Sequence, residues 1–227
     1  RTTLIGHKLF RRFIFVSSWF FCLNTLLAEG RTQHVDPSVI QSIGSTTEFI
    51  WQARGGNLDP ASESMVTESE ANSSGQELSK EGWHTVRVPA NLMPQDAAKE
   101  IFKQNKENVV WYRKAFFLSG TPDSALALRL GEISDRDRVY LNGVLIGETG
   151  RWEDSRAQAY DHLRIYEIPR DVLRTDRVNV LLIQVKGYLK HEMGIYRDRT
   201  EIGPARLILK DFYLENLWQM LTLAFYL

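Results

Sequence analysis

Apolar and polar residues alternate along much of the chain between residues 83 and 213. Leu126, Leu128 and Leu130, for example, are separated by Ala127 and Arg129. This period of two residues is typical of a β-strand that buries one face. Runs rich in aromatic and β-branched residues add to the pattern. The strands predicted in this way cover residues 46–52, 86–88, 109–118, 126–130, 139–141, 144–147, 163–168, 178–186 and 205–213.

The dipeptide Asn142-Gly143 separates two of these strands. It is a strong hairpin signal, because both central residues of the favoured turn need a positive φ. Many short strands with turn residues between them, and no recurring helix, predict an all-β fold of two packed sheets. The sandwich is expected to span residues 46–213, with one short helix within the connection at 91–106.

Residues 53–82 interrupt the strand pattern with Gly, Ser, Glu, Asn and Asp. Such a segment contains too few large apolar side chains to offset the entropy of ordering the chain. We therefore expect a flexible surface insertion here, without chemistry of its own.

The N-terminal segment has the pattern of an export signal. Lys8, Arg11 and Arg12 precede the apolar run 13–23, and Ala28 offers a small residue for cleavage. The sequence predicts a signal peptide at 1–28 followed by a linker at 29–45, although an uncleaved anchor remains an alternative. The only cysteine, Cys22, lies in this segment, so the mature domain is expected to have no disulfide.

Residues 214–227 become strongly apolar, and Trp218 and Tyr226 suit a membrane interface. They predict the start of a transmembrane helix, with a terminal helix packed on the sandwich as the alternative. Because the sequence starts with Arg1 and ends inside this apolar run, we expect it to be part of a longer protein. The sandwich is accordingly expected outside the cytoplasm, periplasmic or extracellular.

The charge balance does not favour a nucleic-acid partner. Lys and Arg number 28, Asp and Glu number 28, and the isoelectric point is about 7.2. DNA and RNA select proteins with a concentrated positive field, which this composition does not supply. At 227 residues, 43% of them hydrophobic, the chain suits one domain with appendages.

Five short motifs follow one another along the chain: 83–89 (WHTVRVP), 111–113 (WYR), 139–147 (VYLNGVLIG), 179–185 (NVLLIQV) and 194–197 (GIYR). In order and spacing they resemble the sugar-binding jelly roll of family 2 glycoside hydrolases, over about residues 46–209. The resemblance implies a galactose-binding-like jelly-roll fold and a carbohydrate ligand. In that family the catalytic residues lie in a separate barrel after the sandwich.

Here the sandwich instead runs into the apolar segment that ends the chain. This layout is similar to the periplasmic sensor region of bacterial seven-transmembrane receptors with intracellular signalling modules. It implies a non-catalytic, ligand-sensing domain of a membrane receptor. The alternatives are an accessory domain of a family 2-like glycoside hydrolase, or an interaction module that dimerises receptors and binds no small molecule.

No catalytic residues are predicted. Carboxylates such as Asp135 and Asp137 stand beside Arg136 and Arg138, and nothing distinguishes one of them as the acid of a glycosidase. The five histidines occur singly, without metal-ligand spacing. No cofactor is expected, although the loop carboxylates leave a structural Ca²⁺ open.

A ligand site is predicted around Trp152, which lies in a polar loop. A sugar ring offers both C–H patches and hydroxyls, so an aromatic face beside hydrogen-bonding side chains suits it. An exposed aromatic without such a use would be costly, and the alternative is that Trp152 is a lid packed on the core. The predicted ligand-binding residues are Trp152, Arg136, Glu153, Asp161, Tyr188 and Arg197.

Overall fold

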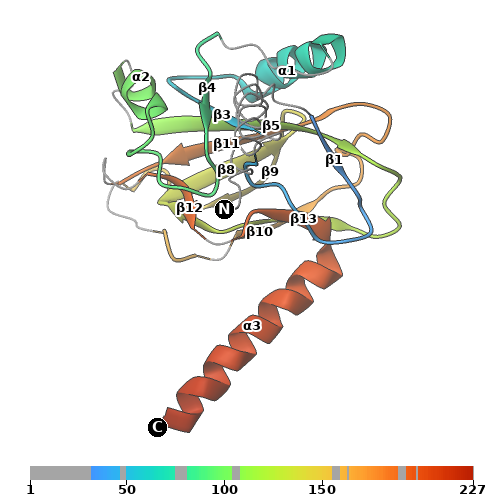
Figure 1. Ribbon diagram of the computed structural model, residues 1–227, viewed down its shortest axis with the longest axis vertical. Coiled ribbons are helices and arrows are strands. Elements are labelled where there is room, and N and C mark those ends of the chain that lie inside the picture. Colours follow the sequence, from blue (N-terminus) through green and yellow to red (C-terminus); the bar gives the residue numbers. More distant parts are fainter. Residues whose placement is uncertain are drawn as a thin grey trace, which may run out of the picture.

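The computed structural model describes residues 32–46, 50–74, 81–103, 108–154, 159–162, 164–188, 193–197 and 199–226. The predicted signal peptide, residues 1–28, lies outside this range. The described strands form two packed sheets and a small two-stranded ribbon (Figure 1). The predicted all-β sandwich is therefore confirmed.

The larger sheet has the strand order β4-β3-β5-β11-β8-β9, with β1 added alongside β5. Its centre is the long antiparallel pair β5 and β11, aligned from Phe116 opposite Asn179 to Val109 opposite Lys186. The strands are β1 (Gln33–Val35), β3 (Trp51–Gly55), β4 (His84–Val86), β5 (Val109–Leu118), β8 (Arg136–Leu141), β9 (Val144–Thr149) and β11 (Asn179–Lys186).

The smaller sheet has the order β10-β6-β13-β2 and packs against the larger one. Val139 and Ile183 of the larger sheet share one buried apolar cluster with Leu128 and Ile202 of the smaller sheet. Its strands are β2 (Gln41–Ser42), β6 (Leu126–Leu130), β10 (Arg164–Ile168) and β13 (Glu201–Pro204), and the ribbon pairs β7 (Glu132–Ser134) with β12 (Gly194–Arg197).

The predicted hairpin is confirmed. Asn142 and Gly143 have φ values of 51° and 85° and connect β8 to β9. The side chain of Asn142 also accepts a hydrogen bond from the backbone N–H of Val180 at 2.8 Å. The turn residue thereby ties the hairpin to β11 as well.

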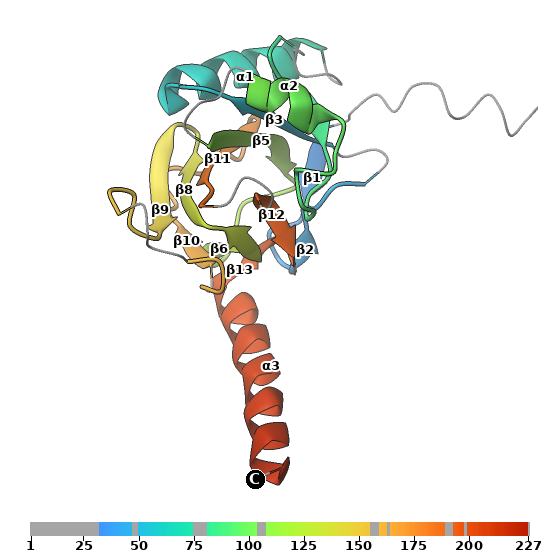
Figure 2. The ribbon, with the colours of Figure 1, turned by 90° about the vertical axis from the view of Figure 1, so that its left-hand side faces the viewer.

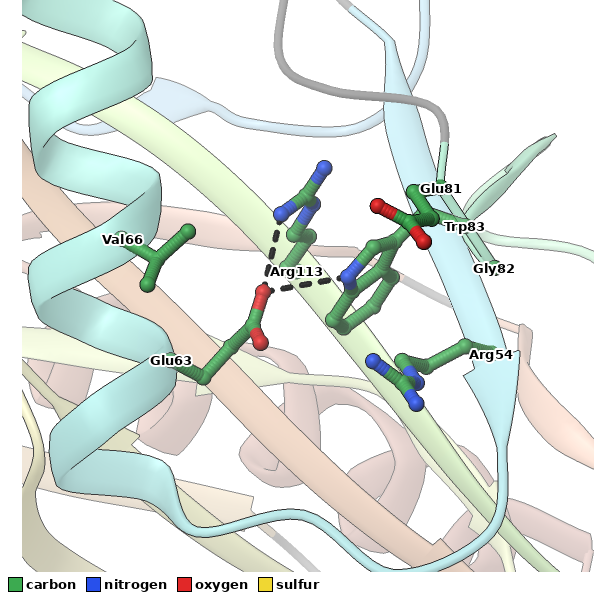
Figure 3. A pocket seen from close by; sticks show the side chains of 7 residues that line it. All are labelled: Arg54, Glu63, Val66, Glu81, Gly82, Trp83 and Arg113. Atoms are coloured by element: carbon green, nitrogen blue, oxygen red, sulfur yellow. Dashed lines mark hydrogen bonds and ion pairs between the residues drawn. The ribbon is translucent and has the colours of Figure 1, made fainter.

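The prediction of a flexible insertion at 53–82 is wrong in its described part. Strand β3 continues to Gly55, and residues 60–74 form the helix α1 (Pro60–Ser74). The Asp59 carboxylate caps this helix by accepting the Ser62 N–H at 3.1 Å, and Pro60 suits its first turn. The helix lies on the outer face of the larger sheet, where Glu63 bonds to Arg113 at 2.9 Å (Figure 3). Polar contacts stabilise this helix, so a low content of large apolar residues did not predict a flexible segment here.

The prediction of a last strand at 205–213 is also wrong. The last strand is β13, and the chain continues directly as the helix α3 (Ala205–Tyr226). Proline lacks an N–H for the sheet ladder, so Pro204 is a natural end for the strand. Ile208, near the start of the helix, is buried, while the helix as a whole extends away from the sandwich (Figure 2). Among the described residues, no helix combines the length and apolar content that a membrane span requires.

The predicted linker at 29–45 contains two strands of the sandwich. Strand β1 pairs in parallel with β5, and β2 pairs with β13. The strand expected at 46–52 begins only at Trp51, and residues 47–49 lie outside the described range. The short helix expected within 91–106 is confirmed as α2 (Ala97–Lys103), which lies with α1 on the side opposite α3 (Figure 2).

Candidate functional site

The loop at residues 150–154, here called the Trp152 loop, is held against the sandwich by Arg136. The Arg136 guanidinium is buried and donates to the carbonyl oxygens of Arg151 at 3.1 Å and Asp154 at 2.6 Å. Gly150 has a φ of 87°, and a Cβ there would lie 2.3 Å from Arg136 Cγ, so glycine is required. Arg136 thus positions the loop, and its described hydrogen bonds are all directed at the loop backbone.

The Trp152 ring is half-buried and lies against two cationic side chains. The guanidinium carbon of Arg138 is 4.4 Å from the ring centre, and Lys186 Nζ is 5.9 Å away. Such cation–π contacts stabilise the ring's position by about 0.5–2 kcal/mol each. The Trp152 Nε1–H is buried and has no hydrogen-bond partner among the described residues. An amphipathic platform results, in which an aromatic ring lies against two cations.

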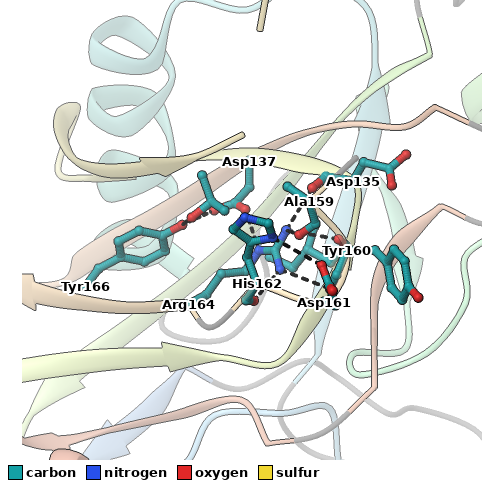
Figure 4. A network of polar contacts seen from close by, with 10 residues as sticks. Asp135, Asp137, Ala159, Tyr160, Asp161, His162, Arg164 and Tyr166 are labelled. Atoms are coloured by element: carbon teal, nitrogen blue, oxygen red, sulfur yellow. Dashed lines mark hydrogen bonds and ion pairs between the residues drawn. The ribbon is translucent and has the colours of Figure 1, made fainter. Parts of the chain in front are cut away.

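Arg164 organises the strand ends beside this loop (Figure 4). It is completely buried, and its Nε donates to Asp137 Oδ1 at 2.6 Å. Tyr166 donates to the other oxygen of Asp137 at 2.5 Å. The terminal nitrogens of Arg164 donate to the backbone carbonyls of Ile133, Asp135, Ala159, Tyr160 and His162. One side chain therefore fixes the segments 133–135 and 159–162.

The electrostatics of this network follow from its burial. Desolvation raises the pKa of the Asp137 carboxyl, while Arg164 and the Tyr166 hydroxyl act in the opposite direction. Burial also raises the pKa of Tyr166, and the neighbouring Asp137 charge adds to this effect. Tyr166 therefore keeps its proton and donates it in the bond to Asp137. Asp137 and Tyr166 serve to fix the strand ends.

The remaining predicted residues surround the same strand ends. Tyr188 is exposed, and its N–H donates to the buried carboxylate of Asp135 at 2.6 Å. Asp161 is exposed beside His162, and Glu153 is exposed in the Trp152 loop. Arg197 belongs to β12, and its side chain lies outside the described atoms. Arg136, Arg164 and Asp135 thus bring together the segments that carry Trp152, Glu153, Asp161 and Tyr188.

The prediction overlooked Arg138, Lys186 and Arg164. Arg138 follows Arg136 by two residues, so strand alternation places both side chains on one face. Lys186 is aligned with Arg136 across the β8–β11 pair, which only the strand register reveals. Arg164 carried no sequence signal, because an arginine at a strand start is ordinarily exposed.

Within the described part of the chain, no group of three or more His, Cys, Asp or Glu side chains could hold a metal ion. The structural Ca²⁺ therefore stays a prediction without a described ligand set.

The chain resembles parts of several solved β-glucuronidases. It matches Ruminococcus gnavus β-glucuronidase with 19% identity and a TM-score of 0.42, over 66% of this chain and 21% of that chain. It matches a calcium-binding mutant of Bacteroides uniformis β-glucuronidase 2 with 20% identity and a TM-score of 0.48, over 72% and 18%. This chain thus spans about a fifth of those enzymes. The assignment to a sandwich rests on the strand pairing described above.

No protein-family profile matches the sequence. No curated protein matches it either.

Proposed function

We propose that this chain is a non-catalytic, ligand-sensing domain in the extracytoplasmic part of a membrane-anchored bacterial signalling receptor. Its ligand would be a carbohydrate or a similar small polar molecule, bound at the Trp152 loop. The observation that carries the proposal is the ionic junction between the sandwich and α3, because a sensor must pass a change at its site to another part of the protein.

The junction joins strand and helix without a linker, since Pro204 ends β13 and Ala205 begins α3. Arg129 of β6 is almost fully buried and bonds to Glu215 at 2.9 Å, with Asp211 at 3.6 Å. Arg199 pairs with the same two carboxylates from the other side. Two arginines of the sandwich thereby hold two acidic residues that lie one helical turn apart. The helix direction is consequently tied to the smaller sheet.

The strand ends beside the Trp152 loop are connected to the junction through paired strands. Arg164, which holds the loop at 159–162, begins β10, and its neighbour Ile165 is aligned with Arg129 of β6. Arg129 is in turn aligned with Glu201 of β13, the strand that leads into α3. A ligand that displaces the loops would move β10 and β6, and with them the arginine that holds the helix. Ligand binding would then shift the population of helix orientations.

The Trp152 end also offers the groups that sugar recognition needs. The indole of Trp152 is partly exposed and supplies an aromatic surface for the C–H patches of a sugar. Glu153, Asp161 and Tyr188 are exposed in segments that Arg136, Arg164 and Asp135 hold together.

The binding part of the proposal predicts that W152A weakens carbohydrate affinity about tenfold, because an aromatic anchor contributes much of such an interface. A glycan array with the full chain would identify a binder, and calorimetry would measure its affinity. L145A is a matched control, since Leu145 is an exposed side chain on neighbouring β9 and is not one of the predicted site residues. A folded protein that binds no glycan, or a W152A variant that binds as well as the parent, would refute the proposal.

The coupling part predicts faster amide hydrogen exchange in α3 when the junction is weakened. D211N and E215Q should each raise exchange rates in residues 207–217 about tenfold, because each removes charged hydrogen bonds to Arg129 or Arg199. Exchange in β5 and β11 should not change. K210Q removes a charge from the same helix at an exposed position, so it serves as the control. Equal exchange in K210Q and E215Q would show that the junction does not restrain the helix.

A further inference from the structure

Two adjoining hollows lie on the α1 side of the sandwich, away from the Trp152 loop. The first, of about 290 Å³, is lined among others by Arg54, Glu63, Trp83 and Arg113 (Figure 3). The second, of about 320 Å³, is lined among others by Arg54, Asn57 and His84. Each is near the lower end of the volumes typical of small-molecule sites. Arg54 and Gly82 line both hollows, so they adjoin at this arginine.

The walls of the first hollow are fixed by a compensated polar cluster. Arg113 is buried, and it donates to Gln52 Oε1 at 2.7 Å and to Glu63 Oε1 at 2.9 Å. The same Glu63 oxygen accepts the Trp83 Nε1–H at 3.0 Å. The charges of Arg113 and Glu63 therefore offset each other, and Trp83 is locked in place between α1 and β4.

Arg54 differs from Arg113 in having no carboxylate partner within the part of the chain that the structure describes. Its guanidinium carbon is 5.6 Å from the centre of the Trp83 ring. Its Nε is buried without a hydrogen-bond acceptor, and no described carboxylate lies within ion-pair distance of it. Charged side chains that are shielded from water are ordinarily paired. Arg54 is thus a partly buried, positioned cation for which the described residues supply no anion.

We propose that these hollows form a binding site for a small molecule with a single carboxylate, held by Arg54. A guanidinium binds a carboxylate through two parallel N–H···O bonds, and the Trp83 ring holds that guanidinium in position. Asn57 and His84 line the second hollow, where they can bind the polar groups of the ligand.

The charge of the ligand follows from the other lining residues. Besides Glu63, whose charge Arg113 offsets, two more carboxylates line the hollows: Glu81 lines the first and Glu100 lines the second. These carboxylates would repel a doubly charged anion such as phosphate, because charges separated by a few ångströms interact strongly when partly shielded from water. One uncompensated guanidinium matches one carboxylate.

The test is calorimetric titration of the full chain with gluconate, lactate and benzoate, each compared with an uncharged counterpart: sorbitol, propane-1,2-diol and benzyl alcohol. We expect saturable binding of at least one carboxylate and none of its counterpart. R54Q should weaken that binding about tenfold or more, because it removes a charge-assisted pair. R87Q is the matched control, since Arg87 is exposed beside β4 and does not line either hollow.

The shift of the Trp83 indole N–H in a nuclear magnetic resonance spectrum locates the binding, and circular dichroism verifies that R54Q is folded. A titration with inorganic phosphate tests whether the hollows reject a doubly charged anion. The proposal is overturned if no carboxylate binds, if phosphate binds more tightly, or if folded R54Q binds as the parent does. W152A should bind the carboxylate unchanged, so a failure here is separate from a failure of the glycan site.

Discussion

Replacing Arg164 with methionine is expected to lower the free energy of unfolding by about 3–5 kcal/mol, the usual cost of removing one partner of a buried ion pair. Arg164 is fully buried, and the substitution leaves the Asp137 carboxylate without its cation. The substitution also removes the hydrogen bonds that Arg164 donates to the backbone carbonyls of segments 133–135 and 159–162. Urea unfolding of the full chain, followed by circular dichroism, measures the loss.

Two further variants make this measurement specific. R170M removes an exposed arginine that begins the turn after β10, and it should change the free energy by less than about 0.5 kcal/mol. The double variant R164M/D137L should be more stable than R164M alone, because it no longer buries an unpaired carboxylate. A loss in R164M no larger than that in R170M would show that the network does not stabilise the fold.

The strands of the sandwich could be predicted because their signal is local. Alternation in 126–130 and the Asn142-Gly143 turn depend on residues next to one another, and the structure has β6 and the β8–β9 hairpin at those positions. A period of two residues specifies which face of a strand is buried without any knowledge of its partner.

The helices were harder to predict, for two different physical reasons. Helix α1 has little apolar surface and is held by ion pairs such as Glu63–Arg113, whose partner lies 50 residues away. Its capping signal, Asp59 followed by Pro60, was nevertheless present in the sequence. In residues 205–213 the apolar and polar positions fit the period of a strand as well as that of a helix. The ion pair between Asp211 and Arg129 is made from the helical conformation, and the sequence alone does not reveal it.

The candidate sites depend on long-range contacts, so the sequence predicted them only in part. Trp152 can be recognised in the sequence because a tryptophan in a polar loop is unusual, whereas the role of Arg136 in holding that loop is visible only in the fold. Arg54 and Trp83 are far apart along the chain and meet only through the pairing of β3 with β4. An unpaired arginine cannot be recognised in a sequence, because pairing is a property of the folded chain.

A buried lysine in the core gives the second large prediction. Lys114 of β5 lies opposite Leu181, is 2% exposed, and has its Nζ 5.7 Å from the centre of the Trp51 ring. Burial penalises the charged amine and lowers the pKa of Lys114 from 10.5 to about 7. The protein should therefore become more stable as the pH rises above neutrality, at least until other groups titrate.

The sign follows from the protons bound in each state. Between about pH 7 and about 10.5 the unfolded chain keeps the Lys114 proton, whereas the folded protein has mostly lost it. The unfolding free energy should thus rise by about 1.4 kcal/mol per pH unit in this window. Below the window the lysine is charged in both states, so the full cost of burying the charged amine lowers the stability. Urea unfolding at several values between about pH 7.5 and about 9.5 measures this slope.

The K114M variant should lose the pH dependence, whereas K99M, which replaces an exposed lysine of α2, should retain it. Equal slopes in all three proteins would mean that the Lys114 amine stays protonated in the folded state, and hence that the core tolerates its charge.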